Sequence, residues 1–273
     1  MKTRLIVAIA SVVLSPALHA ATLTVTTNAD SGTGSLRQVL ADAAAMAGPD
    51  TIVFDPLLAG QTISLTTSSN GSAITINDAG GVTIDATGVP GIVIDDGTAT
   101  SYGLFFVTPD SVGTFRGLTF ANGGGANFST GGGAIGNGGT LKLERCTFSG
   151  NSTTGGGFAD GGAIASVGTL TLTHCTLTGN SAGDTGGAID FAGTLTLTHC
   201  TLSNNTAGNT GGAIRNAGML TLNNCIVAGN TAPTNANISG TIGSGSNNLT
   251  SGDPKLAALA DNGGPVETMA LLP

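Results

Sequence analysis

The chain has 273 residues, of which 45 are glycine, and only 9% of its side chains are charged. The glycines do not recur at every third position as in collagen, and few charges repel one another as they do in a disordered acidic chain. A formal net charge of −8 argues against the positive surface that a nucleic acid or an anionic lipid would require. This composition instead favours a β-rich fold with many turns, because glycine adopts positive φ without steric cost.

Residues 1–20 have the three-part pattern of a secretory signal peptide. Lys2 and Arg4 precede an apolar run that starts at Leu5, and small residues follow up to Ala20. The apolar run is shorter than the roughly 20 residues of a membrane-spanning helix. We therefore expect the mature chain to start near Ala21. The bond that is cut stays open, because Leu18 is unusual three residues before the cut, and a buried N-terminal helix is the alternative.

Residues 21–60 are expected to form an N-terminal cap made of a strand and one amphipathic helix. Residues 35–47 carry apolar side chains at helical spacing, namely Leu36, Val39, Leu40, Ala43 and Met46. Gly48 and Pro49 end this pattern. Such a helix would cover the open edge of the first strands.

Short apolar runs then predict strands at 52–54, 63–65, 74–76, 82–84 and 92–94. We expect residues 61–116 to form irregular early coils of a solenoid.

Residues 117–252 carry a repeat of about 25 residues. Gly-Gly-Ala-Ile begins at four positions, which are Gly132, Gly161, Gly186 and Gly211. Each copy is followed 14 residues later by a cysteine and 19 residues later by an asparagine, which gives Cys146, Cys175, Cys200 and Cys225, and Asn151, Asn180, Asn205 and Asn230. Residues 117–122 form a partial upstream copy, in which Gly117 aligns with the four cysteines. We call each set of equivalent residues in successive units a column. Chance does not produce such equal spacing, so the repeat predicts a solenoid.

The alternation of threonine and leucine in 169–173 predicts a strand with one buried face. A bend at Thr173-His174 would bring Leu172 and Cys175 to the same interior. Three short strands per unit then make one coil, and stacked coils place equivalent residues about 4.8 Å apart. The four asparagines would form an amide ladder at a turn.

These motifs resemble known families. Gly-Gly-Ala-Ile followed by Phe148-Ser149-Gly150-Asn151 resembles the GGAI and FxxN repeats of polymorphic outer-membrane proteins, and more broadly bacterial secreted right-handed parallel β-helix proteins. Residues 28–38 and 50–55 resemble the N-terminal region of CSLREA-containing proteins, although Gly-Ser-Leu-Arg-Gln-Val at 34–39 replaces that motif. Asp-Pro-Lys-Leu at 253–256 and residues 261–265 resemble the segment before a choice-of-anchor C-terminus.

The resemblance implies an all-β fold, a single-stranded right-handed parallel β-helix with a short N-terminal capping helix. Residues 253–273 would be a C-terminal tail that is the start of a truncated anchor region.

The cysteine column predicts stacked free thiols that act as small interior side chains. Neighbouring Cα atoms would lie within the range of a disulfide, so pairing stays an alternative, although parallel Cβ vectors disfavour it.

His174 and His199 share a second column with Arg145 and Asn224. Two imidazoles could share a metal ion, but the obvious third and fourth ligands are missing. We therefore assign no metal site and no cofactor.

Catalysis by β-helix enzymes on polysaccharides needs clustered carboxylates. Asp190 beside Arg215 predicts a surface ion pair instead. The other candidates are Asp160 and Asp184 in neighbouring loops, Lys142 and Glu144 on one strand face, and Asp85, Asp95 and Asp96 in the early coils. Only the last three could converge, so we assign no catalytic residue.

Outward threonines form columns, namely Thr140, Thr169 and Thr194, then Thr171, Thr196 and Thr221, then Thr173 and Thr198. They are typical of a solvated strand face. A second reading is an ice-binding surface, interrupted by Lys142, Glu144 and the histidines.

The sequence favours a secreted or cell-surface β-helix protein, an adhesin-like binding scaffold without catalysis, either released or held on the outer membrane. Its partner would be an extracellular glycan or the surface of a host or neighbouring cell, and it would be a monomer. The alternatives are a polysaccharide lyase or glycoside hydrolase of the pectate-lyase-like class, and a structural envelope component.

Overall fold

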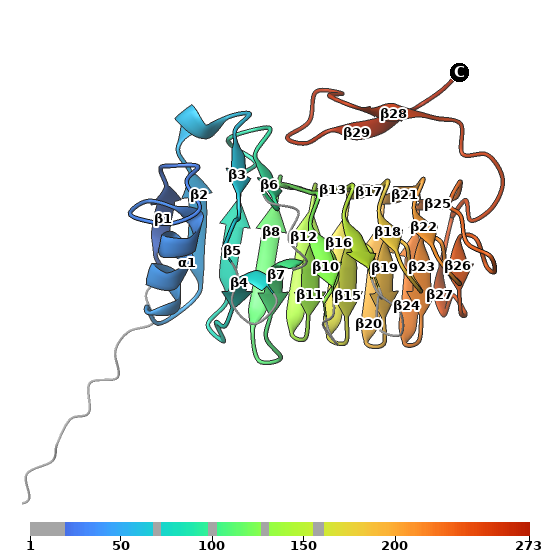
Figure 1. The fold of residues 1–273 in the computed structure, drawn as a ribbon, viewed down its shortest axis with the longest axis horizontal. Coiled ribbons are helices and arrows are strands. Elements are labelled where there is room, and N and C mark those ends of the chain that lie inside the picture. Colours follow the sequence, from blue (N-terminus) through green and yellow to red (C-terminus); the bar gives the residue numbers. More distant parts are fainter. Residues whose placement is uncertain (1–19, 68–71, 98–102, 127–130, 155–160) are drawn as a thin grey trace, which may run out of the picture.

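The computed structural model describes residues 20–67, 72–97, 103–126, 131–154 and 161–273. Most of the expected signal peptide, residues 1–19, and the candidate Asp160 lie outside them. The described chain winds into a right-handed parallel β-solenoid of about seven turns (Figure 1). The all-β fold predicted from the repeat is therefore confirmed.

The turns build four parallel sheets, which we number in the order in which a regular coil passes through them. Sheet 1 contains β1 (Thr22–Val25), β2 (Asp50–Phe54), β5 (Val82–Asp85), β8 (Val112–Arg116), β12 (Thr140–Glu144), β16 (Thr169–Thr173), β20 (Thr194–Thr198), β24 (Met219–Asn223) and β27 (Ser244–Ser246). Sheet 2 contains β3 (Thr62–Ser64), β6 (Val93–Asp95), β9 (Thr119–Ala121), β13 (Thr147–Ser149), β17 (Thr176–Thr178), β21 (Thr201–Ser203) and β25 (Ile226–Val227).

Sheet 3 contains β10 (Gly124–Ala126), β14 (Ser152–Thr154), β18 (Ser181–Ala182) and β22 (Thr206–Ala207). Sheet 4 contains β4 (Ser72–Ile76), β7 (Gly103–Val107), β11 (Ile135–Asn137), β15 (Ile164–Ser166), β19 (Ile189–Phe191), β23 (Ile214–Asn216) and β26 (Ile238–Ser239). The expectation of three strands per unit is therefore wrong for the regular coils. A short fourth strand follows the ladder asparagine, where two or three residues show too little alternation to be recognised.

The bend between sheets 1 and 2 uses one residue in the left-handed conformation in each regular coil. Arg145, His174 and His199 have φ of 51°, 54° and 54°. This residue reverses the alternation of inward and outward side chains. Leu172 before the bend and Cys175 after it are therefore both buried, as the sequence predicts for the bend at Thr173-His174.

The register corrects the alignment of the upstream partial copy. Glu144 pairs with Arg116, so Gly117 lies in the bend column, where its φ is 65°. Leu118, not Gly117, fills the position under Cys146. That coil is one residue shorter than expected, and its glycine, which adopts positive φ without strain, lies at the bend rather than in the interior.

The predicted asparagine ladder is confirmed. The side-chain Nδ2 of Asn151 donates to Oδ1 of Asn180 at 2.9 Å, and Asn180 and Asn205 continue the chain at 2.9 and 3.0 Å. Asn230 donates to Asn237 at 3.1 Å. Each Oδ1 also accepts a backbone N–H from the previous coil, as Asn205 does from Asn180 at 3.0 Å. The ladder thus satisfies buried backbone groups where the chain leaves sheet 2.

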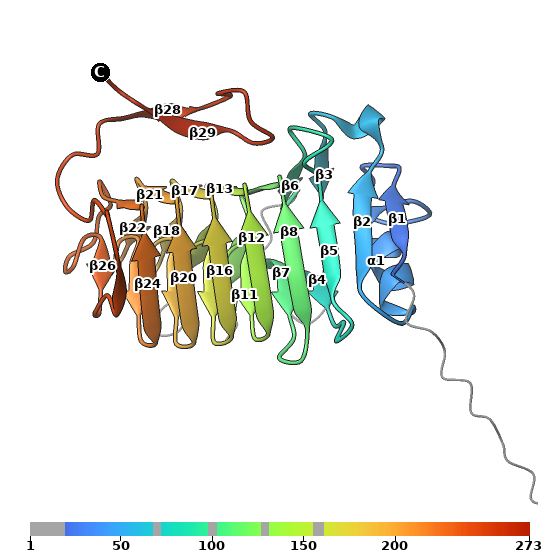
Figure 2. The same cartoon turned by 180° about the vertical axis from the view of Figure 1, so that it is seen from behind.

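One helix, α1 (Leu36–Ala44), covers the first turn beside β1 and β2 (Figures 1 and 2). Ser35 caps its N-terminus by accepting the N–H of Gln38 at 3.2 Å. The apolar side chains predicted at helical spacing are buried except for Met46, which lies beyond the end of the helix and is 44% exposed. The predicted capping helix is therefore confirmed, but it is shorter than the apolar pattern. A short 3-10 helix, η1 (Pro56–Leu58), follows β2.

An ion pair fastens the segment before α1 to the loop after β3. Arg37 Nη2 lies 2.6 Å from Asp30 Oδ1. The other oxygen of Asp30 accepts the hydroxyls of Thr66 and Thr67, each at 2.9 Å. Burial alone raises the pKa of Asp30, but these hydrogen bonds outweigh burial and hold the pKa below its ordinary value of 3.8.

Residues 253–273 fold back along the solenoid as an antiparallel hairpin of β28 (Leu256–Ala260) and β29 (Thr268–Leu271). Figures 1 and 2 show it beside the strands of sheet 2. The Thr147 hydroxyl donates to the Glu267 carbonyl at 2.7 Å, and the Gly91 N–H donates to the Pro265 carbonyl at 3.0 Å. The segment expected as a tail is therefore docked on earlier coils.

Replacing a central rung of the ladder should destabilise the whole solenoid. Asn205→Ala removes the acceptor of the Asn180 N–H and leaves several buried groups without partners, so we expect a loss of about 3 kcal/mol or more. Urea unfolding followed by circular dichroism measures it. Thr206→Ala, at the exposed neighbouring position, is the matched control. Equal unfolding midpoints for the two variants would contradict the role of the ladder.

Removing the charge of Asp30 should loosen the cap. Asp30→Asn should lower the free energy of unfolding by about 1 kcal/mol at neutral pH, since charged hydrogen bonds are lost at a partly solvated site. Because the pKa of Asp30 is lower in the folded chain, its contribution is present above pH 3.8 and disappears as the pH falls through the folded value. The difference in the free energy of unfolding between the variant and the parent chain should therefore be smaller at pH 3 than at pH 7.

Candidate functional site

The outward face of sheet 1 carries a regular array of hydroxyl groups. Its centre consists of Thr169, Thr171 and Thr173 on β16 and Thr194, Thr196 and Thr198 on β20, which pair directly. We call these six residues the threonine face. Their neighbours Leu170, Leu172, Leu195 and Leu197 point inward and are buried, so each threonine is held outward. Figure 2 looks onto this side of the solenoid.

The array changes on both sides of the threonine face. On β24 the three outward positions hold Met219, Thr221 and Asn223, and Met219 is 68% exposed. On β12 they hold Thr140, Lys142 and Glu144. The regular threonine lattice therefore extends over two adjacent coils, and chemically different side chains continue the same surface.

A charge cluster follows the threonine face toward the N-terminus. Glu144 lies between Lys142 and Arg116, and Arg116 Nε is 2.8 Å from Glu144 Oε2. Arg116 also approaches Asp85 at 3.6 Å. The Lys142 ammonium, together with Arg116, holds the pKa of Glu144 below its ordinary value despite partial burial. The expected sharing of one strand face by Lys142 and Glu144 is confirmed, and their charges are paired.

His174 and His199 stack in the exposed bend column beside the threonine face. Their ring centroids are 4.9 Å apart and the ring planes differ by 8°. Nitrogen lone pairs lie in the plane of an imidazole ring, so those of two parallel stacked rings do not converge on one ion. Among the described residues, no group of three His, Cys, Asp or Glu side chains is arranged to hold a metal ion.

Asp190 and Arg215 form the predicted ion pair on sheet 4, with 2.9 Å between Asp190 Oδ1 and Arg215 Nη1. Arg215 lies at the surface as expected, with 37% of its side chain exposed, whereas Asp190 is only 6% exposed. Its second oxygen accepts the Thr185 hydroxyl at 2.7 Å. The residues around it form a structural link between coils rather than an open acid–base site.

The early carboxylates do not gather into one site. Asp85 ends β5 in sheet 1, whereas Asp95 ends β6 in sheet 2, and Asp96 follows Asp95. The bend between the two sheets separates them. Asp85 Oδ1 accepts the N–H of Thr87 at 2.9 Å and so stabilises the turn after β5. Asp184 lies in a different part of the fold, after β18, where its carbonyl accepts the Asn209 N–H at 2.8 Å.

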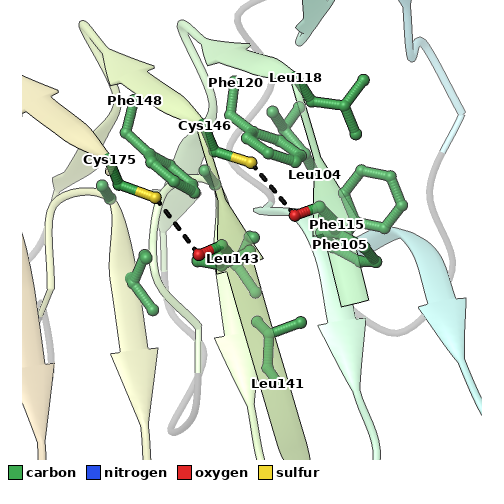
Figure 3. Packing of buried hydrophobic residues seen from close by; sticks show 14 of the residues in the cluster. Leu104, Phe105, Phe115, Leu118, Phe120, Leu141, Leu143, Cys146, Phe148 and Cys175 are labelled. Atoms are coloured by element: carbon green, nitrogen blue, oxygen red, sulfur yellow. Dashed lines mark hydrogen bonds between the residues drawn. The ribbon is translucent and has the colours of Figure 1, made fainter. Parts of the chain in front are cut away.

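The four cysteines are buried free thiols. Figure 3 shows the sulfur of Cys146 directed at the Phe115 carbonyl and that of Cys175 at the Leu143 carbonyl, over distances of 3.4 and 3.5 Å. Phe120 and Phe148 stack beside them with centroids 4.8 Å apart. Burial raises the pKa of the Cys175 thiol, and the buried thiol column serves packing, as the sequence predicts.

Two surface features that involve the C-terminal part of the chain were not predicted from the sequence. Four outward side chains of sheet 2 are buried on the side where the hairpin docks, namely Thr147, Thr176, Thr178 and Ser203. An open depression of about 380 Å³ lies on the last coil beside Asn237, Ile238 and Ile242. Neither feature has a signature in the repeat, because both depend on how irregular segments fold back.

No protein-family model matches the chain, and no curated protein matches it either. The single described α-helix has nine residues, and no helix in the described part is long and apolar enough to cross a membrane. The repeat fold itself places the chain among right-handed parallel β-helix proteins.

The thiols should resist modification until the solenoid unfolds. A thiol reagent such as iodoacetamide should label no cysteine in the folded protein and all four in urea without reductant, because all four are at most 1% exposed. Intact mass spectrometry counts the labels. Two labels or none in urea would reveal disulfides and contradict the free-thiol structure.

Proposed function

We propose that the protein is a secreted, adhesin-like binding scaffold, without catalysis of its own, that holds a neutral extracellular glycan against the outward face of sheet 1. The observation that carries the proposal is the threonine face, which presents hydroxyl groups in register on adjacent strands. Carbohydrate hydroxyls exchange hydrogen bonds with such groups. The likeness of the repeats to polymorphic outer-membrane and CSLREA-type surface proteins supports an extracellular place, in solution or on the outer membrane.

The charges of the face favour a neutral ligand over an acidic one. Each cation of the charge cluster is paired with a carboxylate, as Lys142 and Arg116 are with Glu144. The chain as a whole carries a formal net charge of −8. An acidic polysaccharide would therefore meet repulsion without a compensating basic site.

The sheet provides a rigid support for a repeating ligand. Equivalent side chains recur about every 4.8 Å along the solenoid axis, and the leucines beneath them are fully buried. A preorganised surface loses little side-chain entropy on binding, which compensates for weak individual hydrogen bonds. The protein would act as a monomer. Its affinity for the glycan would rise as more coils contact the same polysaccharide chain.

Binding to immobilised cellulose, xylan, dextran and chitin tests the proposal. We expect at least one of these neutral polysaccharides to retain the protein, and Thr171→Lys with Thr196→Lys to weaken retention at least about tenfold, because two lysines interrupt several hydrogen bonds. The measurement is a depletion isotherm on each polysaccharide.

The matched control places the same two charges on another face. Ser181 and Thr206 are exposed and paired on β18 and β22, so Ser181→Lys with Thr206→Lys should bind as the parent chain does. Equal loss in both variants, or no retention on any polysaccharide, would refute the proposal. Release of reducing or unsaturated ends would indicate the enzyme alternative, and thermal hysteresis would indicate ice binding.

A further inference from the structure

A buried carboxylate lies at the beginning of the described chain. Asp50, the first residue of β2, is only 1% exposed. Its Oδ1 accepts the backbone N–H of Ala21 at 2.8 Å. Its Oδ2 is also buried and has no hydrogen-bond partner among the described residues. Burying a carboxylate with only one neutral hydrogen-bond donor is energetically unfavourable. A cationic donor at this site would compensate for that burial.

The backbone nitrogen of Ala21 is fixed beside this carboxylate by the sheet. The Ala21 carbonyl accepts the N–H of Thr51 at 2.8 Å, and the next residue, Thr22, pairs with Thr51 in the parallel ladder of β1 and β2. The N–H of Asp50 donates to the Gly81 carbonyl at 2.9 Å. Both partners are therefore positioned by backbone hydrogen bonds and not by flexible side chains.

We propose that the peptide bond between Ala20 and Ala21 is the processing site, and that the new α-ammonium group of Ala21 forms an ion pair with the buried carboxylate of Asp50. A secretory endopeptidase would add water to this bond. Ala20 leaves as a carboxylate, and the nitrogen of Ala21 takes up the proton to become an ammonium group. The inference rests on the secretion proposed above but not on the glycan.

The structure distinguishes this bond from its neighbours. An ammonium group carries three donors, so it can serve both oxygens of Asp50 where the amide N–H serves one. If the chain began at Ala20, Ala21 would keep its neutral amide and the charge would lie on an exposed residue. If the chain began at Thr22, the donor to Asp50 would be lost. Only a start at Ala21 pairs the buried charge.

The first test is the mass of the secreted product. The full chain is expressed in a Gram-negative bacterial host, and the protein recovered outside the inner membrane is analysed by intact mass and N-terminal sequencing. A chain that begins at Ala21 supports the proposal, and any other first residue overturns it. Failure of glycan binding would leave this result unaffected, so the two proposals are tested separately.

The second test measures the coupling between the two groups. Chains 20–273 and 21–273, released from a cleavable fusion with free amines, are compared with and without Asp50→Asn. Both retain the whole described core, since its buried apolar side chains begin at Val25. At a fixed urea concentration, the chain starting at Ala21 should have a folding equilibrium constant at least about tenfold larger than the chain starting at Ala20.

This advantage should vanish in the Asp50→Asn pair, because the ammonium group then has no charged partner. Asp55→Asn is the matched control. Asp55 caps η1 by accepting the Leu57 N–H at 2.9 Å, so its replacement should cost the two chains equally. An advantage of the Ala21 start that survives Asp50→Asn, or no advantage at all, would overturn the ion pair.

Discussion

The asparagine ladder is the interaction on which the regular part of the solenoid depends. A parallel sheet satisfies its own backbone groups, but the chain must leave sheet 2 in every coil, and the groups at that corner point into the interior. One buried amide per coil accepts from the coil before it and donates both to its neighbour in the column and to a carbonyl, as Asn180 does to Asn205 and Phe148. Since a missing rung would leave buried polar groups unpaired, each coil must supply an amide at the same place.

Inward side chains must be apolar, and outward side chains must avoid repulsion between like charges. The left-handed residue at the first bend lets leucine and cysteine columns both face inward, and the resulting core is apolar from Val25 to Val227. Outward residues stack over their own equivalents, where like charges would repel at strand spacing. The structure meets this by alternating sign along one column, from Asp85 through Arg116 to Glu144, and by pairing Asp190 with Arg215 in another. Most other outward positions of the regular coils carry neutral hydroxyl or amide groups. The chemistry available to the protein therefore lies on its outer faces.

Periodicity made the regular coils predictable. Spacing alone located the ladder, the buried thiol column and the bend at His174, because each of these features recurs at the same position in several units. It could not locate features that occur once. The shift of Gly117 into the bend column and the burial of Asp190 depend on tertiary contacts of a single coil. The fourth strands of sheet 3 do recur, but strands of two or three residues such as β18 are too short to show alternation. The docking of the hairpin on Thr147 likewise has no counterpart in any repeat.

The two ends of the solenoid show how a repeating fold stops. At the first turn, α1 covers the sheet and the pair of Asp30 with Arg37 ties it to the loop after β3. At the last turn, the hairpin lies along the side of the solenoid, and the terminal strands β25, β26 and β27 have only two, two and three residues. Short, irregular edge strands are poor templates for another chain. The described solenoid is thus ended by a helix on one side and by shortened strands on the other, with the regular coils between them.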